Sequence, residues 1–127
     1  MSTHTDNFAK GDILKGNRKL GAVHRIVYLS EWDHLFFLGA MVTHSDQSDN
    51  ILMSEEHFWV VDQDNKRFEF QFENTYMVRA RLFKRQEWGP FDKVGELTEK
   101  GIAFVEANLP SREPRPWEEY LDDNSAN

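Results

Sequence analysis

The chain of 127 residues contains no cysteine, so thiol nucleophiles, disulfide frameworks and thiolate zinc sites are excluded. Long apolar runs are also lacking, and none approaches the roughly 20 residues that span a bilayer. The N-terminal residues do not show the basic and then apolar order of a signal peptide. These absences predict a cytoplasmic protein with no membrane partner.

An excess of basic residues is missing as well. The chain has 15 Lys and Arg against 22 Asp and Glu, a formal net charge of −7. Broad coating by nucleic acid is therefore disfavoured, because phosphate contacts need cations. The charge is uneven, however: residues 79–85 contain four bases and no acid, whereas residues 111–127 contain five acids and two arginines. Local charge decides whether an anion can dock.

The composition suits one folded domain. Hydrophobic residues make up 39% of the chain, with ten Phe and four Trp, which is enough for one core. We expect a flexible leader at residues 1–9, a single domain at residues 10–109, and an acidic, proline-containing tail at residues 110–127 that is extended or mobile.

Short β-branched and aromatic segments between turn residues predict a chain of strands. The expected strands are 10–14, 23–29, 35–43, 58–61, 67–73 and 76–83, with a short strand or turn at 93–97. Phe68, Phe70 and Phe72 should face inward, because polar residues alternate with them. Thr98 should cap a helix that continues to Leu109. The pattern predicts a mainly β fold with a C-terminal α-helix, in a small antiparallel β-barrel.

The strand at 35–43 ends in a cluster of polar groups. Its apolar run passes through Gly39 and stops at Thr43, His44 and Ser45, which a turn-rich segment follows at 46–50. The end of a buried strand holds side chains on a rigid support, so catalytic or binding groups are expected there.

The order of several motifs resembles the MazF/PemK-type toxins over residues 10–109. The motifs are Gly11-Asp12-Ile13, a basic loop bounded by glycines at 16–21, His24-Arg25 heading a strand, Thr43 ending the next, the arginine-bearing strand 76–83, and Gly95-Glu96-Leu97-Thr98 before a helix. The resemblance implies an SH3-like barrel that forms a homodimer. It further implies a sequence-selective endoribonuclease that cleaves single-stranded RNA with no metal or other cofactor, and a possible cognate antitoxin protein as a partner.

The same resemblance implies which residues are catalytic. The family pairs a basic residue at the head of one strand with a hydroxyl residue at the end of the next, which here suggests Thr43 with Ser45 nearby. The family's usual Arg-Pro is replaced by His24-Arg25-Ile26, so His24 and Arg25 both remain candidates for the basic position.

RNA cleavage by the 2′-hydroxyl needs a base, an acid and a cation. Imidazole, which titrates near 6.5, could supply the first two and arginine the third. The predicted catalytic residues are His24, Arg25, Thr43 and Ser45, and the predicted substrate-binding residues are His44, Arg79, Arg81 and, as a base-stacking platform, Trp88.

Other interpretations stay open. The acidity and the missing proline favour a noncatalytic barrel of the same fold, acting as a binding or regulatory module. His44 could be a turn residue that bonds only to the local backbone, and Arg79 and Arg81 could form a solvated strand face. A metal-dependent hydrolase would need ligands among His24, His34, His44, His57, Asp33 and Asp46, which have no HxH or HExxH spacing.

Overall fold

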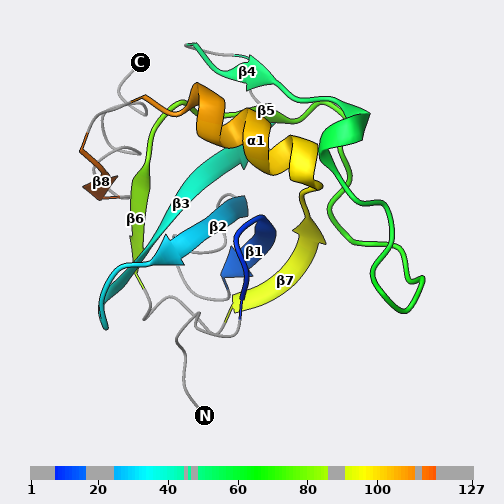
Figure 1. Ribbon diagram of the computed structural model, residues 1–127, viewed down its shortest axis with the longest axis horizontal. Helices are drawn as coiled ribbons and strands as arrows, with labels where there is room; N and C mark the ends of the chain where they lie inside the picture. Colours follow the sequence, from blue (N-terminus) through cyan, green and yellow to red (C-terminus); the bar gives the residue numbers. More distant parts are fainter. Residues whose placement is uncertain are drawn as a thin grey trace.

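The computed structural model describes residues 8–16, 25–44, 46, 49–85, 91–110 and 113–116. Its elements, in chain order, are β1 (Asp12–Gly16), β2 (Arg25–Glu31), β3 (Phe36–Thr43), β4 (Ile51–Leu52), the 3-10 helix η2 (Glu55–His57), β5 (Tyr76–Met77), β6 (Leu82–Arg85), β7 (Phe91–Glu96), α1 (Glu99–Asn108) and β8 (Arg115–Pro116) (Figure 1). The predicted mainly β fold with one helix near the C-terminus is confirmed. Within the described ranges, no helix has the length and apolar character needed to cross a bilayer.

One sheet contains all of the strands. Its order is β4-β5-β3-β2-β1-β7, and β6 pairs with β3 on one side and with β8 on the other. All of these pairs are antiparallel except β6 with β8. The end strands β4 and β7 do not pair with each other in the described chain, so closure into a barrel stays a prediction. Residues 58–70 lie beside β7 instead, where the Phe70 N–H donates to the Val94 carbonyl at 2.8 Å.

β3 is paired along both of its edges. β2 runs along one edge, from Arg25 opposite Val42 to Glu31 opposite Phe37. The other edge is divided, because β6 pairs with Phe36–Gly39 and β5 pairs with Val42–Thr43. Gly39 is required here, since a Cβ at this position would lie 2.5 Å from Ile26 Cδ1 and 2.7 Å from the Val27 carbonyl oxygen.

Both faces of the central strands are buried. On β2, Val27 and Leu29 belong to one hydrophobic core, and Ile26 and Tyr28 belong to a second. The two sets alternate along the strand, because successive side chains project to opposite faces. The first core also contains residues of α1, which crosses one face of the sheet (Figure 1). The central strands therefore have a hydrophobic core on each face.

The helix begins and ends as predicted. Thr98 is its N-cap, and its hydroxyl accepts a hydrogen bond from the Gly101 N–H at 3.2 Å. The same hydroxyl donates to the Glu56 carbonyl at 2.6 Å, which joins the start of α1 to η2. Val105 and Leu109 are buried in the first core, as their spacing indicated.

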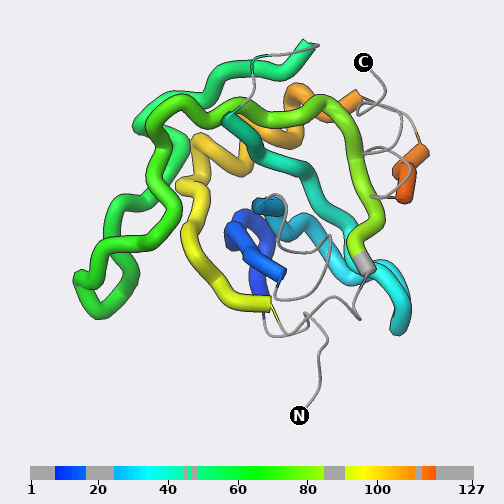
Figure 2. The backbone as a smooth tube through the Cα atoms, turned by 180° about the vertical axis from the view of Figure 1, so that it is seen from behind, coloured from blue at the N-terminus to red at the C-terminus, as the bar shows by residue number. Residues whose placement is uncertain are grey.

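The strands predicted at 58–61 and 67–73 are wrong as continuous elements. They form a projecting hairpin (Figure 2) whose arms are joined by a bridge between Val61 and Arg67. The Asp62 carboxylate stabilises the turn between the arms, because it accepts from the Asp64 and Lys66 N–H groups at 2.8 and 2.9 Å. A hairpin with so few neighbours lacks the lateral partners that a regular strand needs.

The aromatic residues of this hairpin follow the inward prediction in part. Phe70 and Phe72 pack against the first core. Phe68 is half-buried and lies under Lys93, whose Nζ is 5.9 Å from the ring centroid.

The strand predicted at 76–83 is interrupted. Met77 pairs with Val42 and Leu82 with Gly39, so five steps along this segment match three along β3. The two extra residues form an excursion at 79–81, with a tight turn in which the Ala80 N–H donates to the Val78 carbonyl at 2.9 Å. Val78, Ala80 and Leu82 nevertheless all pack in the second core.

The segments outside the predicted domain are described in part. Phe8 of the predicted leader packs against the second core, and the Ala9 N–H donates to the Asp12 carboxylate at 3.0 Å. In the predicted tail, Arg115–Pro116 form β8 alongside β6. Residues 1–7 and 117–127, for which mobility was predicted, lie outside the described residues.

Gly101 offers a test of the contact between α1 and η2. A Cβ at Gly101 would overlap the His57 carbonyl oxygen, which is backbone and cannot rotate away. Gly101→Ala should therefore lower the free energy of unfolding by about 1–2 kcal/mol, even though alanine favours a helix by ~1 kcal/mol. Ala103→Gly, at an exposed position of the same helix, is the control and should cost ~1 kcal/mol. Urea unfolding measures both, and a gain of stability in Gly101→Ala would contradict the contact.

Candidate functional site

The predicted catalytic residues are described in part. His24 and Ser45, together with the predicted stacking residue Trp88, lie outside the described residues. Arg25 is the first residue of β2 and Thr43 the last of β3, and these ends lie side by side because Arg25 pairs with Val42. Paired residues project to the same face and successive residues to opposite faces. Arg25 and Thr43 therefore share one corner of the sheet and project from opposite faces.

The guanidinium of Arg25 at this corner has a weak ion-pair partner. Its side chain is 26% exposed, and Nη2 lies 3.7 Å from a Glu69 carboxylate oxygen that belongs to a 61% exposed side chain. Ion pairs of this length and exposure contribute little free energy. A phosphate could displace Glu69 and take two hydrogen bonds from the guanidinium.

His44 follows Thr43 at the same corner and is exposed. Its Nδ1 lies 2.9 Å from the Asn74 carbonyl oxygen, so in the neutral ring Nδ1 carries the proton and donates. This partner is 30 residues away in sequence, so the bond is not the local backbone bond that one interpretation of His44 predicted. The same bond leaves the Nε2 lone pair as the acceptor, which is the form that a general base needs.

Arg79 and Arg81 are engaged elsewhere. Arg79 donates from Nε to the Asn108 carbonyl at 3.4 Å and lies 3.6 Å from the Asp49 carboxylate. Arg81 lines a small cavity of about 210 Å³ together with Lys10 and Glu106. Both side chains are exposed, as expected for a solvated strand face. Their contacts do not join them to the ends of β2 and β3, so they do not form a shared phosphate-binding track with that corner.

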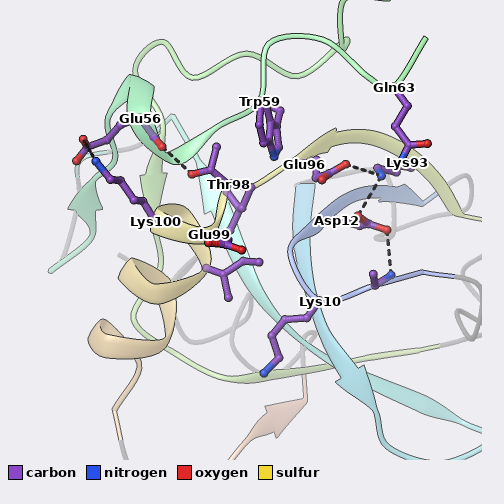
Figure 3. A pocket seen from close by; sticks show the side chains of 13 residues that line it. Lys10, Asp12, Glu56, Trp59, Gln63, Lys93, Glu96, Thr98, Glu99 and Lys100 are labelled. Atoms are coloured by element: carbon purple, nitrogen blue, oxygen red, sulfur yellow. Dashed lines mark hydrogen bonds and ion pairs between the residues drawn. The ribbon is translucent and has the colours of Figure 1, made fainter. Parts of the chain in front are cut away.

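A larger cleft, of about 880 Å³, was not predicted from the sequence (Figure 3). It lies between the start of β1, the end of β7, η2, the start of α1 and the projecting hairpin. Its lining residues are Ala9, Lys10, Asp12, Glu56, Trp59, Gln63, Lys93, Glu96, Leu97, Thr98, Glu99, Lys100 and Ile102. The apolar run 58–61 predicts a strand, and nothing in the sequence marks Trp59 as exposed.

The floor of the cleft is a charged triad. Lys93 Nζ lies 3.1 Å from Asp12 Oδ1 and 2.8 Å from Glu96 Oε1. Asp12 is 6% exposed, and Gly11 sustains the turn before it with a φ of +100°. Burial alone would lower the pKa of Lys93, but its hydrogen bonds to Glu96 and Asp12 and their negative charges outweigh burial and raise that pKa. The ammonium is thus held in its charged form.

The rim carries an aromatic side chain and further carboxylates. Trp59 is 51% exposed and its indole reaches into the cleft (Figure 3). Within the described chain the indole makes no hydrogen bond or ring contact, in contrast to Trp32, whose ring centroid lies 4.9 Å from that of Phe83. Glu56 pairs with Lys100 at 3.5 Å. Glu99 makes no ion pair or side-chain hydrogen bond with another described residue.

The histidines do not gather into a metal site. The described residues contain no group of three or more His, Asp or Glu side chains that could hold a metal ion. His57 is instead buried: its ring lies 4.3 Å from that of Phe104, and its Nδ1 accepts from the Ser54 N–H at 3.0 Å. The contacts of His57 are those of a core residue.

Comparisons with family models, with curated proteins and with solved structures gave no match. The resemblance to the MazF/PemK-type toxins therefore depends on this chain's own motifs and their order.

Lys93 should stabilise the fold through the buried Asp12. Lys93→Met leaves that carboxylate without its cation, so we expect the free energy of unfolding to fall by about 1–2 kcal/mol, a figure reduced because Lys93 is 35% exposed. Lys66→Met is the control, since the Lys66 side chain makes no described ion pair, and it should change stability by under ~0.5 kcal/mol. Denaturant unfolding measures both. Equal effects would show that the triad contributes nothing.

His57 should make stability depend on pH. Burial lowers the pKa of His57 below 6.5, with a smaller opposing effect of the Glu56 carboxylate. The unfolded chain then binds more protons, so this contribution is complete above pH 6.5 and is lost as the pH falls from there toward the lowered value. Unfolding of wild type and His57→Gln, measured at pH 7.5, 6.5 and 5.5, should diverge in slope only below about pH 7. Parallel curves would contradict the assignment.

Proposed function

We propose that the protein is a divergent MazF/PemK-like endoribonuclease that cleaves single-stranded RNA at selected sequences without a metal ion. The observation that supports this proposal is that β2 begins at Arg25 beside the end of β3, where Thr43 and His44 follow in sequence. A cation, a hydroxyl and an imidazole are thus available at one corner of the sheet, with Arg25 and Thr43 on opposite faces. The homodimer and the cognate antitoxin partner belong to the same proposal.

The reaction is a transesterification. The 2′-oxygen attacks the adjacent phosphorus and the bond to the 5′-oxygen breaks, which leaves a 2′,3′-cyclic phosphate and a 5′-hydroxyl end. His44 Nε2 takes the proton of the 2′-hydroxyl, and the departing 5′-oxygen takes one from a second acid, for which His24 is the predicted residue. Arg25 neutralises the charge that builds on the phosphorane, and the Thr43 hydroxyl donates to a non-bridging oxygen.

Arg25 and Thr43 project from opposite faces of the sheet, which is compatible with their separate roles in this reaction. A phosphate placed beyond the strand ends is approached from one side by the long guanidinium and from the other by the short hydroxyl. Arg25 has to exchange Glu69 for the phosphate, which costs little because the pair is 3.7 Å long and exposed at Glu69.

The test is cleavage of a long, mixed-sequence single-stranded RNA in EDTA. Wild type should give discrete cuts with cyclic phosphate ends. Thr43→Val, which keeps the shape but removes the hydroxyl, should lower the rate about 100-fold, whereas Thr43→Ser should stay within about tenfold. Arg25→Ala should lose a similar factor, and Arg25→Lys should recover only part of it because lysine cannot bind bidentately.

Arg67→Ala is the matched control for loss of positive charge. Arg67 is exposed on the hairpin and makes no described side-chain contact, so its variant should cleave at the wild-type rate. Circular dichroism of each variant separates lost chemistry from lost folding. Cuts that persist at full rate in Thr43→Val, or that require a divalent metal, would overturn the proposed mechanism.

A second function follows if folded wild type makes no cuts. The protein is then a noncatalytic barrel that acts as a binding or regulatory module. The cleft favours this alternative, because the larger described cavity lies away from the predicted catalytic corner and is lined by residues that the ribonuclease proposal does not use.

A further inference from the structure

The floor of the cleft already accommodates one positively charged group. One ammonium, that of Lys93, lies between the two carboxylates of Asp12 and Glu96. Lys100 is taken by Glu56, and Lys10 pairs with Glu106, outside the cleft lining, at 3.0 Å. The cations of the cleft are therefore all engaged. Glu99 and one charge of the Asp12–Glu96 pair remain uncompensated, so the open space has negative character.

The aromatic wall faces the same space. Trp59 is fixed at the rim because its backbone N–H donates to the Glu96 carbonyl at 2.9 Å, while half of its side-chain surface stays exposed. An indole face attracts cations through its quadrupole, and tryptophan is the strongest of the aromatic side chains in this respect. An indole beside uncompensated carboxylates selects a positively charged group with apolar surface.

We propose that this cleft binds a small organic cation, an alkylammonium or guanidinium group that lies on the Trp59 indole and pairs with Glu96 and Glu99. The volume of about 880 Å³ is in the range of sites for small molecules. Hydrogen bonds from the cation to carboxylates fix its position, and the indole covers its hydrocarbon part. The site is separate from the proposed ribonuclease corner and does not depend on it.

Anionic ligands fit the cleft poorly. Lys10 and Lys100 are in exposed ion pairs and could exchange partners, but the lining still carries four carboxylates against three ammonium groups. Lys93 can turn toward a phosphate only by leaving the buried Asp12 uncompensated. RNA, the substrate of the proposed ribonuclease, is therefore expected to bind elsewhere.

The site can be located by NMR on the full chain. The four tryptophans give four indole N–H signals, and Trp59→Phe identifies the one that belongs to Trp59. Spermidine and N-acetyl-argininamide are the two probes, the first an alkylammonium and the second a guanidinium. At least one should shift the Trp59 signal along a saturable curve and leave that of Trp32 in place. The probe that binds identifies the source of the cation.

Charge variants test the pairing by calorimetric titration of the same probe. Glu99→Gln should weaken its binding about threefold, as loss of one exposed charge pair implies, and Trp59→Ala should weaken it about fivefold. Glu73→Gln removes an exposed charge on a turn outside the cleft lining and should leave the affinity unchanged.

Four results would overturn the proposal. They are no saturable shift with either probe, equal shifts with magnesium chloride at the same ionic strength, equal affinity in the Glu99→Gln and Glu73→Gln variants, and a shift of Trp59 by a short single-stranded oligonucleotide in place of the cations. None of these results bears on RNA cleavage in EDTA, so the two proposals fail independently.

Discussion

Complete enclosure of β3 is the constraint on which the rest of the molecule depends. Both of its edges carry hydrogen-bonded neighbours and both of its faces carry core residues, Ala40 and Val42 on one side and Phe37 and Met41 on the other. A strand fixed in this way cannot shift its register without moving both cores. Thr43 and His44 leave the sheet from this strand, so their position is set by the best-supported part of the fold.

The cleft depends on a second junction, between η2 and the start of α1. Thr98 joins the two through its hydroxyl, and Gly101 lets the backbones of α1 and His57 meet closely. This junction holds Glu56 and Glu99 beside β7, while the hairpin that starts directly after η2 carries Trp59 to the rim. One local contact thus sets both walls of the cleft.

The sequence alone predicts those elements whose signals lie within one short segment. β1, β2, β3 and α1 could be predicted because the apolar, β-branched and aromatic runs between turn residues and the Thr98 cap are encoded within each segment. The excursion at 79–81 could not, since it follows from the pairing of Met77 and Leu82 with β3, a partner some 40 residues away in sequence. The same is true of 58–61, whose apolar residues are exposed because the hairpin has few neighbours.

The corner and the cleft also differ in how far the sequence predicts them. The corner of Arg25 and Thr43 could be predicted from motif order, although their opposite faces became visible only with the register of β2 against β3. The cleft brings together Asp12, Trp59, Lys93 and Glu99 from four separate segments, and no spacing in the sequence connects them.

The pairing of β8 with β6 bears on how two copies of this chain could meet. Arg115–Pro116 cover the outer edge of β6 at Leu82–Phe83, and the hairpin occupies part of the outer edge of β7. Among the described strands, β4 and β8 each pair on one side only, but each is only two residues long. A continuous sheet through two subunits therefore has little backbone to build on. The proposed homodimer would have to form through side chains. Substitutions could then strengthen or weaken its interface without any change to the sheet.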